Sequence, residues 1–169
     1  MITQSIVQPI VRPITQSIDG YHLAPLIGVG LNNGGFETAG GGGSDVFANW
    51  SETIGSGSSM TRDTVDFASG VASCKIVMDA ANPFTQISQA VLSGVSKIRY
   101  RITAKSTGGN WLIGGNAGGD NFTITFTSDW ATYEGDVDLE NGSTLFVLKR
   151  NSSGGFTYWL DNVYVWAIE

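Results

Sequence analysis

The sequence predicts an all-β protein, a β-sandwich that is preceded by an extended arm at the N-terminus. Glycine accounts for 23 of the 169 residues, and charged residues make up only 14% of the chain. An average soluble protein has about 7% glycine and about 25% charged residues. Short segments of alternating polarity, separated by glycine-rich turns, recur from Asn32 onward. These features are typical of a sandwich and argue against a helical bundle or a coiled coil.

The net charge, the lengths of the apolar runs and the first residues argue against a nucleic-acid partner, a membrane span and a secretory signal. A net charge of −6 argues against a nucleic-acid partner, because phosphate contacts need clustered Lys and Arg. No apolar run approaches the roughly 18 residues that cross a membrane. Residues 1–4 do not begin a secretory signal peptide. We therefore expect a chain that is made in a host cytoplasm and leaves, if at all, by a route such as the cell lysis that frees virus particles.

The chain has one cysteine, Cys74, and one histidine, His22. Cys74 lies in the mostly apolar stretch 73–78 and has no partner for an intrachain disulfide, so we expect a buried structural thiol. A cysteine-based zinc site needs further Cys or His ligands. No Gly-x-Ser-x-Gly or His-Glu-x-x-His motif is present, and these are the motifs that mark common hydrolases. The sequence therefore predicts a protein that is not an enzyme.

Residues 1–30 form the first of two predicted regions, a docking arm and its connector. Isoleucine recurs at every fourth residue, while Pro9 and Pro13 oppose a helix. In an extended chain this spacing places all of these side chains on one side. Such an arm cannot build a core alone, so we expect it to dock on its own domain, a sister subunit or another protein; a disordered leader is the alternative. The docking residues are Ile2, Ile6, Ile10, Ile14 and Ile18.

Residues 31–169 form the second predicted region, the sandwich domain. Polar and apolar residues alternate in Val95–Lys105, Asn121–Thr127 and Thr132–Glu140, which predicts strands with one buried face. Leu145–Leu148 is apolar on both faces, so we expect a central strand there. Phe156–Ile168 is expected to be a final strand pair or a bent strand. Glycine-rich turns separate these segments.

Two of the predicted strands carry rows of opposite charge on their polar faces. The basic row is Lys97, Arg99, Arg101 and Lys105, and the acidic row is Glu134, Asp136, Asp138 and Glu140. If the strands are neighbours, or meet across a subunit interface, the rows pair and fix the register. Paired carboxylates also serve glycosidases, but a plain solvated strand face explains the acidic row better.

Several motifs of this second region carry a family resemblance. They are the opening segment 31–37 with Asn-Asn-Gly-Gly-Phe-Glu, the segment 47–50 with a Trp, the segment 129–133, and the closing segment 159–165 with Asp-Asn-Val. Their order resembles that of carbohydrate-binding modules with the galactose-binding-like jelly roll. The resemblance implies a jelly-roll β-sandwich for residues 31–168. It also implies that Glu37 and Asp161 help to hold a structural Ca²⁺, which prefers oxygen ligands; the alternative is a capped turn with an exposed carboxylate.

Exposed tryptophans are the candidates for sugar contacts, because sugars stack their C–H faces on flat rings. Trp111 lies between glycine-rich segments and is expected at a loop rim. Trp159 is expected on the same strand face as Asp161, opposite Tyr158 and Leu160. Trp111 and Trp159 are therefore the candidate glycan-binding residues.

The N-terminal repeat has a resemblance of its own, to the leaders of tailed-bacteriophage virion proteins. Taken with the jelly roll, it implies a virion structural protein, specifically a capsid decoration protein. Such a protein would dock on sister subunits, as a homotrimer, and on the major capsid protein or another virion protein. The alternative is a glycan-binding module of a tail fibre or of a cell-surface adhesion protein.

Overall fold

The computed structural model describes residues 31–81, 84–90, 95–115, 122–139, 145–150 and 154–168. Within these ranges the chain forms twelve β-strands and no helix, which confirms the all-β prediction. No helix in this part of the chain is therefore long and apolar enough to cross a membrane. The arm residues Ile2, Ile6, Ile10, Ile14 and Ile18 lie outside the described ranges, so the docking arm stays a prediction.

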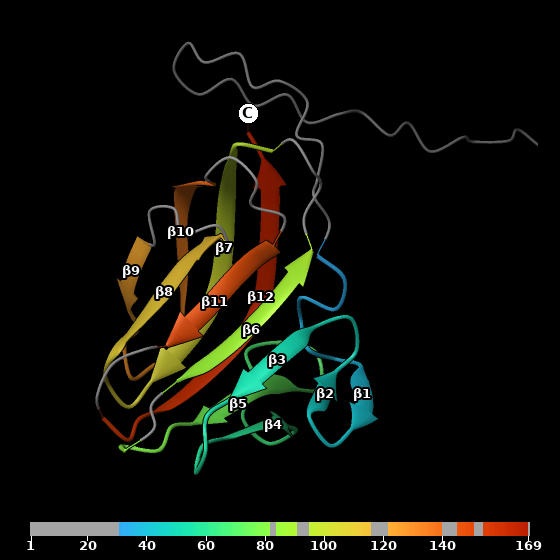
Figure 1. Cartoon of the computed structure of the whole chain (residues 1–169), viewed down its shortest axis with the longest axis vertical. Coiled ribbons are helices and arrows are strands. Elements are labelled where there is room, and N and C mark those ends of the chain that lie inside the picture. The colour runs from blue at the N-terminus through green and yellow to red at the C-terminus, as the bar shows by residue number, and fades with distance from the viewer. Residues whose placement is uncertain are drawn as a thin grey trace, which may run out of the picture.

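Ten of the described strands form two antiparallel sheets that face one another (Figure 1). Sheet I has the order β10 (Ala131–Asp138), β7 (Lys97–Ser106), β12 (Thr157–Ala167), β5 (Ser73–Val77) and β4 (Ser59–Asp63). Sheet II has the order β3 (Ser51–Ile54), β6 (Thr85–Ala90), β11 (Leu145–Arg150), β8 (Asn110–Gly115) and β9 (Phe122–Thr125). A hairpin of β1 (Ala39–Gly42) and β2 (Asp45–Phe47) lies beside them. This arrangement is a jelly-roll β-sandwich.

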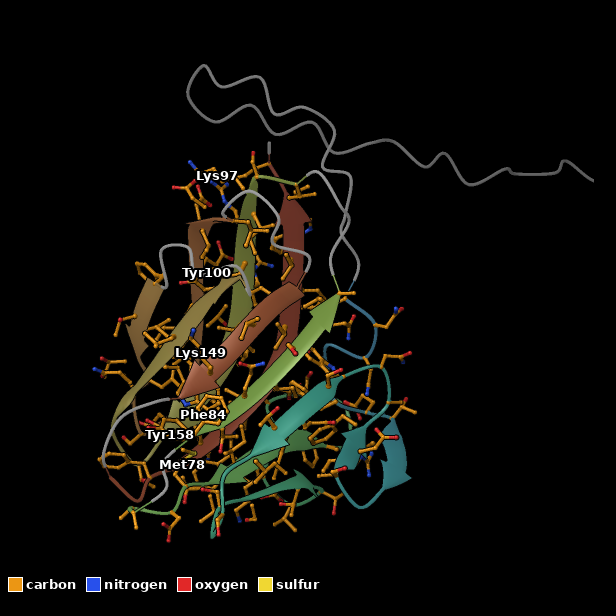
Figure 2. The ribbon with its side chains drawn as sticks, viewed as in Figure 1. Met78, Phe84, Lys97, Tyr100, Lys149 and Tyr158 are labelled. Atoms are coloured by element: carbon orange, nitrogen blue, oxygen red, sulfur yellow. The ribbon has the colours of Figure 1, made fainter. Side chains whose placement is uncertain are left out.

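The core lies between the two sheets and follows the alternation of the sequence. In β7 the residues Ile98, Tyr100, Ile102 and Ala104 are at most 1% exposed, as the pattern predicts. Tyr100 from β7 and Tyr158 from β12 are both buried in this layer (Figure 2). The strand β11 lies at the centre of sheet II, between β6 and β8, which confirms the central strand expected from its two apolar faces. Cys74 is also buried, and burial raises the pKa of its thiol well above the usual value.

Trp111 belongs to this core, so its predicted position at a loop rim is wrong. Its side chain is fully buried, and its ring makes an edge contact with Tyr158 at 5.2 Å between centroids. The glycine turn ends at Gly109, and β8 begins at once with Asn110. Alternation along β8 then points Trp111 inward together with Ile113. A side chain in this position cannot serve as a sugar platform.

The long strand β12 contains a β-bulge that reverses its alternation. Its pairing with β7 shifts between Asp161 and Tyr164. Asn162 within the bulge has a φ of 48°, in the left-handed region that Asn tolerates better than most residues. Before the bulge Tyr158 and Leu160 point inward, whereas after it Val163 and Val165 do so. The bulge therefore turns Tyr164 and Trp166 to the outer face of sheet I.

Candidate functional site on the outer face of sheet I

The charged rows lie side by side on the outer face of sheet I. The strands β10 and β7 pair with Glu134 opposite Arg101, Asp136 opposite Arg99, and Asp138 opposite Lys97. Each of these opposite residues forms an ion pair. Arg99 binds Asp136 through two hydrogen bonds, of 2.7 and 3.0 Å. This contact lowers the pKa of Asp136 and raises that of Arg99. The predicted pairing is confirmed within one subunit for these three pairs, whereas Lys105 pairs with Asp66 instead and Glu140 lies outside the described residues.

A stack of alternating indole rings and ammonium groups occupies the next part of this face. Trp159 points outward, as predicted, and lies opposite Lys105 on β7 and Lys75 on β5. The Lys105 Nζ lies 4.8 Å from the centroid of Trp159 and 5.3 Å from that of Trp130. The Lys75 Nζ lies 5.4 Å from the centroid of Trp159. These distances are typical of cation–π contacts, which fix the positions of the rings.

Two aspartates hold the indoles of this stack in place. The Trp130 Nε1–H donates to Asp66 at 3.1 Å, and the Trp159 Nε1–H donates to Asp63 at 3.1 Å. Asp66 also pairs with Lys105 at 2.6 Å, and Asp63 pairs with Lys75 at 3.5 Å. Burial alone would raise the pKa of Asp63, but its hydrogen bonds and the charge of Lys75 outweigh burial, so the pKa lies below its ordinary value.

A second aromatic station lies farther along β12, beyond the bulge. Tyr164 and Trp166 stack with centroids 6.1 Å apart and an interplanar angle of 19°. The Arg101 guanidinium lies over Trp166, with its Cζ 5.6 Å from the ring centroid. Tyr164 is 48% exposed, which makes it the most accessible of the four aromatic side chains described on this face. Its ring is free to accept a flat apolar partner from solvent.

Glu37 and Asp161, the candidate calcium ligands, meet beneath the loop of residues 64–72. Both carboxylates lie 3.8 Å from the point where a Cβ on Gly35 would stand. Asp161 accepts hydrogen bonds from the N–H groups of Ala68, Ser69 and Asn162. Glu37 accepts from Val71 N–H.

The loop approaches these carboxylates so closely that one position needs glycine. Gly70 has a φ of 69°, and a Cβ there would overlap the Glu37 carboxylate. Asp161 is fully buried. It is therefore not the exposed carboxylate of the alternative to a calcium site, a capped turn with an exposed acid. Burial raises its pKa, backbone hydrogen bonds partly offset that effect, and the charge of Glu37 adds to it.

These two acids fit the oxygen chemistry of Ca²⁺. Neither forms an ion pair with a cationic side chain among the described residues, and the buried Asp161 carboxylate is stabilised by backbone N–H groups alone among its described hydrogen bonds. The same ranges contain no cluster of three or more His, Cys, Asp or Glu side chains. Backbone carbonyl oxygens would therefore have to complete the coordination.

The outer face of sheet II provides a contrast with that of sheet I. Its pairing places Ser51, Ser88, Val147 and Gly114 in one row. The next row is Thr53, Gln86, Lys149, Leu112 and Thr123. Among the described residues of these two rows there is no aromatic side chain. Apart from Phe84, which precedes β6 and is 37% exposed, the aromatic side chains described on the two outer faces belong to sheet I. Trp130, Tyr164 and Trp166 lie outward there and were not among the candidate glycan-binding residues.

No protein-family model matches this sequence, and no curated protein matches it. Many solved structures share its fold. The CBM22-1 xylan-binding domain of Paenibacillus barcinonensis Xyn10C matches with a TM-score of 0.54 and 16% identity, over 80% of this chain and 92% of that one. TmCBM61, solved with β-1,4-galactotriose, matches with a TM-score of 0.55 and 18% identity, over 80% of this chain and 95% of that one.

A viral protein is also among the similar structures. The enzymatically active domain of tailspike protein 4 of bacteriophage CBA120 matches with a TM-score of 0.54 and 16% identity. The match covers 82% of this chain but only 21% of the tailspike chain. At such identities these likenesses establish a shared fold, the jelly roll of carbohydrate-binding modules.

Proposed function

We propose that this protein is a non-catalytic glycan-binding module whose binding surface is the outer face of sheet I. The observation that carries the proposal is the presence of four aromatic side chains, Trp130, Trp159, Tyr164 and Trp166, on that face. Rings that are fixed in advance lose little conformational entropy when a ligand stacks on them. The structures of a xylan-binding domain and of a galactotriose-bound module with the same fold support this assignment.

We propose no catalytic function, because the acidic side chains of this face already form ion pairs. Glu134 and Asp136, the acidic residues first considered for a glycosidase, form ion pairs with Arg101 and Arg99. The contact with Arg99 favours the charged form of Asp136, whereas glycoside hydrolysis needs one protonated acid. The pKa of Asp136 is lowered rather than raised. We therefore propose a structural role for the charge ladder, which consists of the ion pairs Lys97–Asp138, Arg99–Asp136 and Arg101–Glu134.

Affinity gel electrophoresis with a soluble xylan and a soluble β-1,4-galactan tests the glycan-binding function. We expect retardation of the wild-type protein and weaker retardation of Trp159→Ala. The matched control is Phe122→Ala, because Phe122 is an exposed aromatic residue on sheet II, with 48% of its surface accessible. If neither these polymers nor a wider glycan array retains the wild-type protein, the proposed function fails.

We further propose that the arm attaches this module to a bacteriophage virion, as a homotrimeric capsid decoration protein that contacts the major capsid protein. The regular isoleucines of residues 2–18 support an arm that needs a foreign surface. Each isoleucine that becomes buried there contributes about 1.5–3 kcal/mol before ordering costs. The likeness to part of a bacteriophage tailspike is compatible with a virion setting.

Sedimentation of the full chain and of residues 20–169 tests the virion proposal. Full-length trimers that bind purified capsids, together with monomers of the shortened chain that do not, would support it. If removal of the arm changes neither oligomeric state nor attachment, the capsid role is wrong. The glycan-binding proposal does not depend on that result.

A further inference from the structure

The aromatic face of sheet I has a charge pattern that restricts its ligand. Among the described residues of this face there are five Lys or Arg side chains, and each forms an ion pair with a different carboxylate. The pairs are Lys75–Asp63, Lys97–Asp138, Arg99–Asp136, Arg101–Glu134 and Lys105–Asp66. An anionic ligand would have to displace one of these carboxylates before it gained a cation.

Of the cations next to the rings, Lys105 is the most enclosed, whereas Arg101 has 48% of its side chain exposed. Lys105 has only 16% of its side chain exposed, and it lies between two indoles while it pairs with Asp66. Arg101 lies over Trp166 and also pairs with Glu134. In the Lys97–Asp138 pair the carboxylate is the more accessible partner, with 72% of its side chain exposed against 32% for the lysine. Each described cation on this face is balanced by its partner, so the face offers an anionic chain no net electrostatic attraction.

Tyr164 and Trp166 offer what an uncharged sugar needs. The stacked pair presents an apolar ring surface, and the neighbouring Arg101 and Glu134 supply a hydrogen-bond donor and an acceptor for sugar hydroxyls. Tyr164 is also the aromatic side chain of this face with the greatest described exposure. The site therefore combines stacking with hydrogen bonding and has no unpaired cation.

From this geometry we propose that the Tyr164–Trp166 pair is the main stacking station of the module and that its ligands are uncharged glycans. This inference rests on the proposed glycan-binding function and adds the ligand class and the residues that select it. We expect carboxylated, sulfated and phosphorylated polymers to bind more weakly, because every described cation around the rings already pairs with a carboxylate.

Binding to two pairs of polymers that differ in charge tests the inference. The pairs are hydroxyethylcellulose with carboxymethylcellulose, and dextran with dextran sulfate, used beside a neutral xylan and galactan. We expect at least one neutral polymer to bind at least about tenfold more tightly than any anionic one. We also expect added NaCl to change that affinity less than about twofold, since stacking is not screened by salt.

Two sets of variants test which residues determine the preference for neutral glycans. Tyr164→Ala should weaken neutral binding by about tenfold or more, Tyr164→Phe should retain it, and Phe122→Ala should leave it unchanged. The double variant Glu134→Gln/Asp136→Asn frees Arg101 and Arg99, so it should gain salt-sensitive affinity for carboxymethylcellulose.

The outcomes separate this inference from the function on which it rests. Anionic polymers that bind the wild-type protein as tightly as neutral ones would overturn the ligand class and leave a glycan-binding module. Neutral binding that survives Tyr164→Ala unchanged would overturn the assigned station. A protein that binds no glycan at all would overturn both proposals.

Discussion

Tyr164 stacks on Trp166 on the outer face of sheet I because β12 bulges at Asn162. Strict alternation from Tyr158 and Leu160 would carry both side chains into the core. The bulge places Val163 and Val165 there instead. One residue with a left-handed backbone thus adds an aromatic pair to the surface. This local change creates the second station of the candidate binding face.

The charge ladder between β7 and β10 should contribute measurably to stability. Arg101→Glu places like charges opposite each other at Glu134, so we expect a loss of about 1 kcal/mol in the free energy of unfolding. The exchanged pair Arg101→Glu/Glu134→Arg should recover part of that loss. Urea denaturation at low salt measures both values. If the double variant loses as much free energy of unfolding as the sum of the losses in the two single variants, the pairing is contradicted.

Trp111 and Trp159 should respond to truncation in different ways. Trp111→Ala removes a fully buried ring, and we expect the free energy of unfolding to fall by about 3–5 kcal/mol. Trp159→Ala should cost less stability, because this ring is partly exposed, and should weaken glycan binding. Chemical denaturation and affinity electrophoresis of both variants separate these roles. A small stability loss in Trp111→Ala would show that the ring is not part of the core.

The strands and their inward faces could be predicted from the sequence, whereas much of the binding face could not. Alternation in residues 97–105 and 132–138 follows directly from burial of one face, and the charged rows predict the pairing of these strands. The outward position of Trp159, opposite Tyr158 and Leu160, follows from the same rule. The expectation for Trp111 is wrong because the turn at Gly108 and Gly109 does not continue beyond Gly109, and the strand β8 begins at Asn110.

The residues that sequence reasoning missed depend on contacts that alternation does not encode. The outward position of Tyr164 follows from a bulge, for which Asn162 is the only local signal. Trp130 joins the stack through Asp66, which belongs to a loop 64 residues away in the sequence. Glu37 and Asp161 were named through a family resemblance, and the loop that joins them was not foreseen.

Acid should weaken the fold partly through Asp63. Its folded-state pKa lies below the ordinary value, so its contribution to stability is present above the unfolded pKa of about 3.9 and is lost as pH falls through the folded value. Asp63→Asn should therefore make the free energy of unfolding less dependent on pH below about 4. Urea denaturation over a pH series measures that slope. An unchanged slope would mean that the contacts with Trp159 and Lys75 do not stabilise the carboxylate.

Calcium should stabilise the protein if Glu37 and Asp161 hold it with backbone carbonyls, as we propose from the family resemblance and the buried carboxylate. A ligand that binds only the folded state raises the melting temperature. We expect added Ca²⁺ to raise Tm by a few degrees, a chelator to reverse the rise, and Glu37→Gln to abolish it. Asp138→Asn, at an exposed acid of the ladder, is the matched control. A Tm that is insensitive to Ca²⁺ would reject the site.

In the proposed function, the outer face of sheet I contacts the glycan and the outer face of sheet II does not. Backbone amide NMR shifts, recorded while a neutral oligosaccharide is titrated into the full chain, test it most directly. We expect shifts that concentrate around Trp159, Tyr164 and Trp166 and in the neighbouring residues of β7. Shifts that concentrate around Ser88, Val147 and Lys149 on sheet II would contradict it.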